Sequence, residues 1–121
     1  MAVEVSSTHR EAALAQLATV FGVARAFVAT SDGLTVASRG LSDAYDDLDC
    51  ALVAALCGAA RRVLAGLQIG TPVETMIQTD SHALYVLTRG DLLLAVIAER
   101  GAKAGQVRLE MRRAAAVVLA D

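Results

Sequence analysis

Apolar residues recur along the chain with two different periods, one typical of helices and one typical of strands. In the first segment Leu14, Leu17 and Phe21 recur at helical spacing. Thr8 and Glu11 precede them in the arrangement of a capping box, in which two side chains satisfy free amide groups at the start of a helix. The pattern therefore predicts a first helix that has Thr8 as its N-cap and ends soon after Phe21.

A β-hairpin is predicted by two strand-like segments that flank a turn. Residues 23–30 (VARAFVAT) are rich in residues that favour strands, and residues 34–38 (LTVAS) return after Ser31-Asp32-Gly33. Gly33 can adopt the positive φ angle that such a turn requires.

A long helix with almost no charged side chain follows the hairpin. After an acidic start it covers residues 46–67 (DDLDCALVAALCGAARRVLAGL), where Arg61 and Arg62 are the remaining charged side chains, and Gly66 or Gly70 is expected to end it.

Three strands and a last helix complete the pattern. Strands are predicted over residues 73–79, 82–88 and 92–98, and Pro72 stands at the head of the first of them, where its missing N–H does least harm. Residues 101–121 begin with glycines and then become helical. The apolar stripe of this last helix consists of Val107, Met111, Ala114 and Val118.

The order α-β-β-α-β-β-β-α predicts an α/β (α+β) fold. Residues 92–98 (LLLAVIA) show no alternation, so we expect a central strand that is covered on both faces. A sheet buried on both faces needs helices on both faces. Three helices and a five-stranded, mostly antiparallel sheet then form an αβα sandwich, in one domain that spans residues 1–121.

The middle helix predicts a homodimer. One of its faces must cover the sheet, and an apolar opposite face would be exposed in a monomer, whereas such surfaces usually mark interfaces. One set of residues (Leu48, Leu52, Leu56 and Val63) could face one way and another (Cys50, Val53, Cys57 and Leu64) the other, and the sequence leaves open which set faces the sheet. The strand at residues 73–79 has the features of an edge strand that could pair across a twofold axis. The predicted dimer interface consists of Cys50, Val53, Ala54, Cys57, Arg61, Leu64, Val73, Thr75, Met76 and Ile77. Alternatively, an alanine-rich composition makes every helix look apolar.

Composition limits the possible partners. Of the 121 residues, 55% are hydrophobic, and the formal net charge of −2 argues against binding of nucleic acid, which needs a basic excess. No apolar run is long enough to cross a bilayer, and the N-terminus lacks a signal-peptide pattern. Cys50 and Cys57 lie too far apart on one helix for a disulfide. Two unpaired thiols without a secretion signal favour a cytoplasmic protein.

The sequence contains no catalytic, cofactor-binding or metal-binding motif, and none of these activities is predicted. His9 and His82 are isolated and are expected to be solvated. An acidic cluster is better explained by the positive end of the helix dipole than by a metal site, and it comprises Asp43, Asp46, Asp47 and Asp49. Both cysteines have apolar neighbours, which is typical of inert thiols. Arg89-Gly90-Asp91 is interpreted as a hairpin turn.

Three arginines give the last helix a basic face. Arg108, Arg112 and Arg113 lie outside its apolar stripe, with Glu110 as a local partner. Such a run usually forms a solvated face. It could also receive an acidic surface of a partner protein, and the three arginines are therefore the predicted partner-binding residues.

The combined pattern resembles the Roadblock/dynein light chain family, particularly its bacterial members of the MglB type. The features that carry the resemblance are Thr30-Ser31-Asp32-Gly33 in the hairpin, the apolar middle helix, and Gly105-Gln106-Val107-Arg108 after a leucine-rich strand. These motifs occur in the family's order and spacing over nearly the whole chain. Asp32, Gly33 and Gly105 match the pattern as turn and helix-entry residues, since the family has no shared catalytic residue.

The resemblance implies a profilin-like homodimer whose sheets join through the third strand, with the middle helices side by side. It also implies a non-enzymatic regulatory module that binds a small Ras-like GTPase and modulates its nucleotide state or location, since some relatives act as GTPase activators. An activator can reorder the groups of the GTPase without supplying an arginine. If one is supplied, Arg61, Arg62 and Arg112 are the candidates. The alternative is a structural adaptor that binds other proteins regardless of nucleotide.

Overall fold

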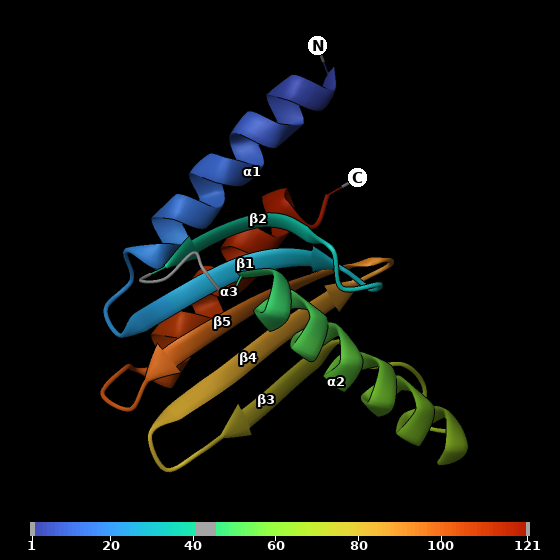
Figure 1. Cartoon of the computed structure of the whole chain (residues 1–121). Helices are drawn as coiled ribbons and strands as arrows, with labels where there is room; N and C mark the ends of the chain where they lie inside the picture. Colours follow the sequence, from blue (N-terminus) through green and yellow to red (C-terminus); the bar gives the residue numbers. More distant parts are fainter. Residues whose placement is uncertain (1, 41–45, 121) are drawn as a thin grey trace.

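The first helix is longer than its capping sequence predicts. The computed structural model describes residues 2–40 and 46–120, and the side chains of residues 8–40 and 47–120. Helix α1 spans Ala2–Ala18, so Thr8 lies inside it and the prediction of an N-cap at this position is wrong (Figure 1). No glycine or proline occurs in residues 2–7, so nothing stops helical propagation before the capping sequence. Leu14 and Leu17 are buried as predicted, whereas Phe21 lies beyond the helix and is 73% exposed.

The predicted hairpin is confirmed. Strand β1 spans Val23–Thr30 and β2 spans Thr35–Gly40. Gly33 has a φ of 91°, and its N–H donates to the carbonyl oxygen of Thr30 at 2.9 Å. A positive φ at this position closes the turn without the steric cost that a Cβ atom would bring.

The remaining elements follow in the predicted order α-β-β-α-β-β-β-α. Helix α2 spans Asp46–Gly66, which confirms Gly66 as its end, and strand β3 spans Glu74–Gln78. Strand β4 spans His82–Arg89 and β5 spans Leu92–Glu99, with Arg89-Gly90-Asp91 at the turn between them. Helix α3 spans Ala104–Val118.

The five strands form one sheet in the order β2-β1-β5-β4-β3, and every neighbouring pair is antiparallel. Strand β5 is central, as its continuous apolar sequence predicts, and its residues Leu93 to Val96 are buried. Strand β3 is an edge strand, as predicted. Its backbone groups on one side therefore have no strand partner within the described residues.

Helices cover both faces of this sheet, which confirms the αβα sandwich (Figure 1). Helices α1 and α3 pack on one face, where the predicted stripe of α3 joins Leu14 and Leu17 in the larger core cluster. The buried residues of that stripe are Val107, Met111, Ala114 and Val118. Helix α2 crosses the opposite face. No helix among the described residues has the length and apolar character needed to span a bilayer.

Candidate functional site

The inner face of α2 packs on its own sheet. Cys50, Val53, Ala54 and Cys57 are all at most 7% exposed. They form the second core cluster together with five residues of the sheet, which are Phe27, Ala29, Val86, Leu93 and Ala95. These four residues were expected at a dimer interface, and that assignment needs correction, because their side chains are already enclosed within one chain. Both cysteines are buried thiols that form no disulfide among the described residues. Burial raises the pKa of the Cys57 thiol, and Arg61 partly offsets this effect.

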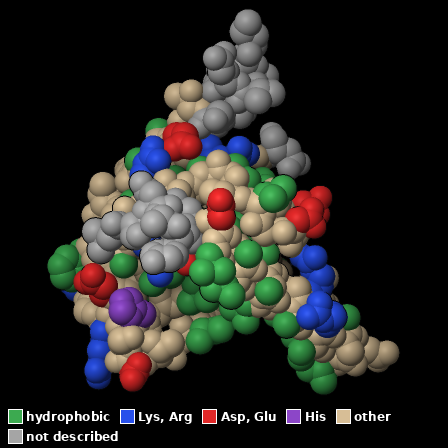
Figure 2. Space-filling view, viewed as in Figure 1, with side chains coloured by type: hydrophobic (Ala, Val, Ile, Leu, Met, Phe, Trp, Pro, Cys, Tyr) green, Lys and Arg blue, Asp and Glu red, His purple; other side chains and the backbone are tan. Residues whose placement is uncertain are grey.

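The outer face of α2 is apolar and open to solvent. Leu48, Leu52 and Val63 lie on it, and Leu52 is 60% exposed. Figure 2 shows hydrophobic side chains gathered over α2 and the sheet surface beside it, with basic side chains farther along the helix. Single exposed apolar residues are ordinary on soluble proteins, whereas a group of neighbouring ones is not. The outer face of α2 is therefore a candidate interaction surface.

The C-terminal part of α2 extends past the sheet. A helix of 21 residues is about 31 Å long, whereas five strands span about 19 Å from the first to the last. In Figure 1 the helix starts over β1 and its last turns project beyond β3. Arg61 and Leu64 continue the inner stripe of α2 into this overhang, where Arg61 is exposed and Leu64 is half-buried. Leu67 and Ile69, just after the helix, are 63% and 67% exposed.

Edge strand β3 presents apolar side chains on both faces. Thr75 and Ile77 pair with Val86 and Leu84, and these β4 residues belong to the cluster beneath α2, so Thr75 and Ile77 lie on the α2 face of the sheet. Met76 lies on the α3 face and is exposed. Val73, which precedes the strand, is exposed as well. The predicted interface residues of this strand are therefore accessible, in contrast to those on the inner face of α2.

An open cavity of about 550 Å³ lies on the α2 face of the sheet, at the end away from the α2 overhang. Its apolar floor includes Phe27, Leu84 and Ile97, and we call it the sheet shelf. Charged groups lie at its rim, where Arg25 donates to the Asp49 carboxylate of α2 and where Glu99 also lines the cavity. The overhang of α2 and the sheet shelf thus lie on the same face of the sheet, at opposite ends.

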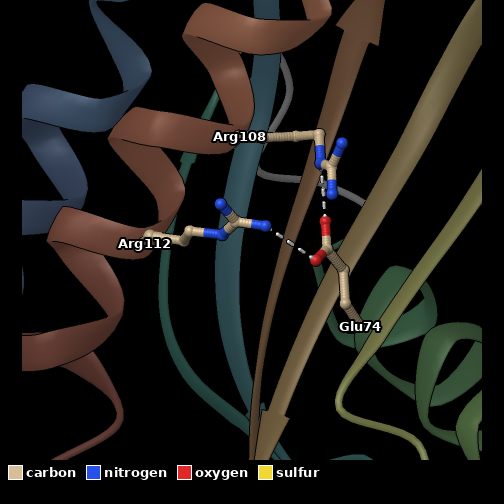
Figure 3. A network of polar contacts seen from close by, with 3 residues as sticks. All are labelled: Glu74, Arg108 and Arg112. Atoms are coloured by element: carbon tan, nitrogen blue, oxygen red, sulfur yellow. Dashed lines mark hydrogen bonds and ion pairs between the residues drawn. The ribbon is translucent and has the colours of Figure 1, made fainter.

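Two arginines of the basic face of α3 share a single carboxylate (Figure 3). The Glu74 carboxylate of β3 accepts hydrogen bonds from Arg108 Nε at 2.7 Å and from Arg112 Nη2 at 3.3 Å. The bond from Arg108, with that from Arg112, lowers the pKa of Glu74 against the opposing effect of burial. The Glu74 carboxylate in turn raises the pKa of Arg108. Arg113 donates to Glu110 at 3.0 Å, the local partner predicted from the sequence.

The sequence reasoning missed Glu74 as the partner of these arginines. The two sides of this network are 34 and 38 residues apart along the chain, so no local pattern joins them. The only available signal was the charge itself, a single glutamate at the start of an otherwise uncharged strand. By contrast, Arg61 and Arg62 of α2 form no ion pair within the described part of the chain.

Other candidate groups lie apart from one another. His9 and His82 are both exposed, as predicted. Asp43 lies outside the described residues, whereas Asp47 accepts a hydrogen bond from the Thr35 hydroxyl at 2.6 Å. Among the residues that the structure describes, no three His, Cys, Asp or Glu side chains come together in a way that could hold a metal ion.

Comparison with known proteins gives consistent matches over most of the chain. A family model described as the Roadblock/LC7 domain matches residues 10–98. The protein MJ0310 of Methanocaldococcus jannaschii is 31% identical over 94 residues, which cover 78% of this chain and 82% of that protein. The crystal structure of a Roadblock/LC7 domain from Streptomyces avermitilis has a TM-score of 0.80 at 27% identity, over 91% of this chain and 92% of that one. Myxococcus xanthus MglB has a TM-score of 0.86 at 18% identity, over 93% and 86% respectively, which shows a shared fold.

Proposed function

The chain belongs to the Roadblock/LC7 domain family, and on that basis we propose that it is a homodimeric, non-enzymatic module that binds a small Ras-like GTPase and modulates its nucleotide state or location. The observation that carries the proposal is the long α2 helix, whose outer face and C-terminal overhang are apolar and exposed. A cytoplasmic location belongs to the same proposal, because a GTPase partner draws on the nucleotide pool of that compartment.

The dimer that we propose joins two copies through α2 and β3. A twofold axis beside β3 would pair the two edge strands and extend the sheet. The same rotation would carry the α2 overhang of one copy toward the sheet shelf of the other, since the two features lie on one face of the sheet at opposite ends. Leu64, Leu67 and Ile69 would then cover the apolar floor at Leu84 and Ile97. In this arrangement the β3 edge, the α2 overhang and the sheet shelf of each copy would all be covered by the other copy.

The GTPase contact that we propose lies on the outer face of α2. Leu48 and Leu52 would supply its apolar centre, and Arg62 would supply positive charge farther along the helix, whereas Arg61 continues the inner stripe. Arg112 is a weaker candidate for a role in GTP hydrolysis, because Glu74 already holds its guanidinium group. An activator of this kind would act by reordering the GTPase, with Arg62 stabilising charge at most.

Binding to purified Ras-like GTPases loaded with GDP or with a non-hydrolysable GTP analogue tests this proposal. We expect a preference for one nucleotide state, and we expect Leu48→Asp to weaken binding strongly because it places a charge in the apolar centre. Leu109→Asp is the matched control, since Leu109 is also an exposed leucine on a helix but lies on α3. Absence of binding in both states, or equal losses in the two variants, would contradict the proposal.

A structural adaptor is the second candidate. It is favoured by the presence of accessible surface features on both faces of the sheet, which would let one dimer hold two partners. The same binding experiment separates the two functions, because an adaptor predicts equal affinity in both nucleotide states.

A further inference from the structure

A second groove lies on the α3 face of the sheet, where the last turns of α3 pass the ends of β3 and β4. Its volume is about 290 Å³. The apolar part consists of Val73, Leu87, Ala115 and Leu119, of which Val73 is 70% exposed at the outer end. We call this feature the α3 groove. It lies on the opposite face of the sheet from α2.

The charges around the α3 groove are mainly positive. Arg89 and Arg112 line it and are both exposed. Arg108 adds a third guanidinium group beside them, and Glu74 is the single carboxylate in the network. Three positive groups against one negative group leave a local positive excess, although the whole chain has a formal charge of −2. Arg89 forms no ion pair among the described residues.

The hydrogen bonding of Glu74 leaves donor groups unused. Arg108 contacts the carboxylate through Nε and Arg112 through Nη2, so each guanidinium keeps further N–H groups (Figure 3). Glu74 thereby fixes the direction of two arginine side chains without using all their donors. Preorganised guanidinium groups bind carboxylates with less loss of side-chain entropy than free ones.

We propose that the α3 groove is a docking site for an acidic segment of a partner protein, with carboxylates at the arginines and an apolar side chain on the floor at Leu87 and Ala115. The combination of an apolar floor and a cationic rim selects this occupant. A basic segment would be repelled, and a small anion would leave the apolar floor open to water. The site is separate from the outer face of α2, so its occupation does not depend on a GTPase.

Fluorescence anisotropy with a labelled synthetic peptide tests this proposal on the full chain. The probe is a twelve-residue peptide, about 40 Å when extended, with the repeat Glu-Leu-Glu-Ser. We expect it to bind at low salt and to be released as salt is raised. Two comparison peptides, with Lys in place of Glu or with Ser in place of Leu, should bind much more weakly.

Matched variants locate the binding site. Arg89→Ala and Arg112→Ala should each weaken binding roughly two- to fivefold, the range for a solvent-exposed ion pair. Arg113→Ala removes the same charge from the same helix but lies on the α1 side, where Arg113 pairs with Glu110, and should leave binding unchanged.

Each alternative result overturns the proposal. Absence of binding by the Glu-Leu-Glu-Ser peptide would exclude the groove as a docking site. Equal weakening by Arg113→Ala would indicate attraction to the overall charge of α3. Equal binding of the comparison peptide that lacks leucine would indicate a simple anion patch. Displacement of the Glu-Leu-Glu-Ser peptide by millimolar phosphate would indicate the same. Because no GTPase is present, none of these results bears on the proposed regulatory function.

Discussion

Substitution of Leu67 or Ile69 by Asp is expected to dissociate the proposed dimer. Both side chains lie at the end of the α2 overhang, and 63% and 67% of their surfaces are open to solvent. In the proposed dimer they would pack on the sheet shelf of the other copy. A carboxylate at either position would have to be buried on that apolar floor or remain outside it, and both outcomes oppose association.

The magnitude follows from the exposed surface. Complete burial of a leucine or isoleucine side chain contributes about 1.5–3 kcal/mol. Because roughly two-thirds of each surface remains open, association can recover about 1–2 kcal/mol for each side chain. A twofold interface contains every residue twice, so one substitution removes about 2–4 kcal/mol from the dimer. The dimer dissociation constant should therefore rise roughly thirty- to a thousandfold.

Sedimentation velocity over a concentration series measures this change directly. Leu109→Asp is the control, because Leu109 is also an exposed leucine but lies on α3, on the opposite face of the sheet from α2. Circular dichroism should show that all three variants remain folded. A wild-type chain that sediments as a monomer at tens of micromolar, or an equal effect of Leu109→Asp, would refute the reasoning.

Three further predictions concern the folded chain itself. Glu74→Gln should lower the melting temperature at pH 7 by a few degrees. The stabilisation by Arg108 is present above the ordinary glutamate pKa of about 4.3 and is lost as the pH falls through the lower pKa of Glu74 in the folded state. The melting temperatures of the wild type and the variant should therefore converge in acid. Gly33→Ala should destabilise by about 1–3 kcal/mol in urea titration, because an alanine would keep the left-handed φ, whereas Gly66→Ala, with open space around it, should not destabilise. The Cys57 thiol should react slowly with a thiol reagent at pH 8 and rapidly in urea, because burial raises its pKa; rapid reaction of the native protein would contradict its placement in the core.

The fold was predictable because each element carries a local signal. The continuous apolar sequence of β5 indicated a central strand, and β5 is central in the sheet. Gly33 indicated a turn between two strands, and its φ angle is positive. The error at Thr8 has a different origin. A capping box favours a helix start, but it does not prevent the preceding residues from continuing the helix when they contain neither glycine nor proline.

The candidate site was predictable only in part, because the two faces of α2 have the same composition. Cys50 and Val53 were assigned to the interface although they face the sheet, while Leu52 and Val63 are the exposed residues. Ala, Leu, Val and Cys occur on both faces, so the hydrophobic pattern defines no direction. The position of the helix start beside β1 and β2 decides which face of α2 packs on the sheet. Long-range contacts such as that between Arg25 and Asp49 set this position.

The length of α2 favours the proposed dimer over the alternative explanation, in which an alanine-rich composition merely makes the helix look apolar. An alanine-rich sequence explains why the outer face looks apolar, but it does not explain why the helix continues beyond the sheet. None of residues 58–66 is buried, although this part includes Val63 and Leu64. Helical segments owe most of their stability to packing, since a short isolated helix is marginal in water. An apolar overhang therefore favours a contact outside the single chain, and in the proposed dimer the sheet shelf of a second copy would provide that contact.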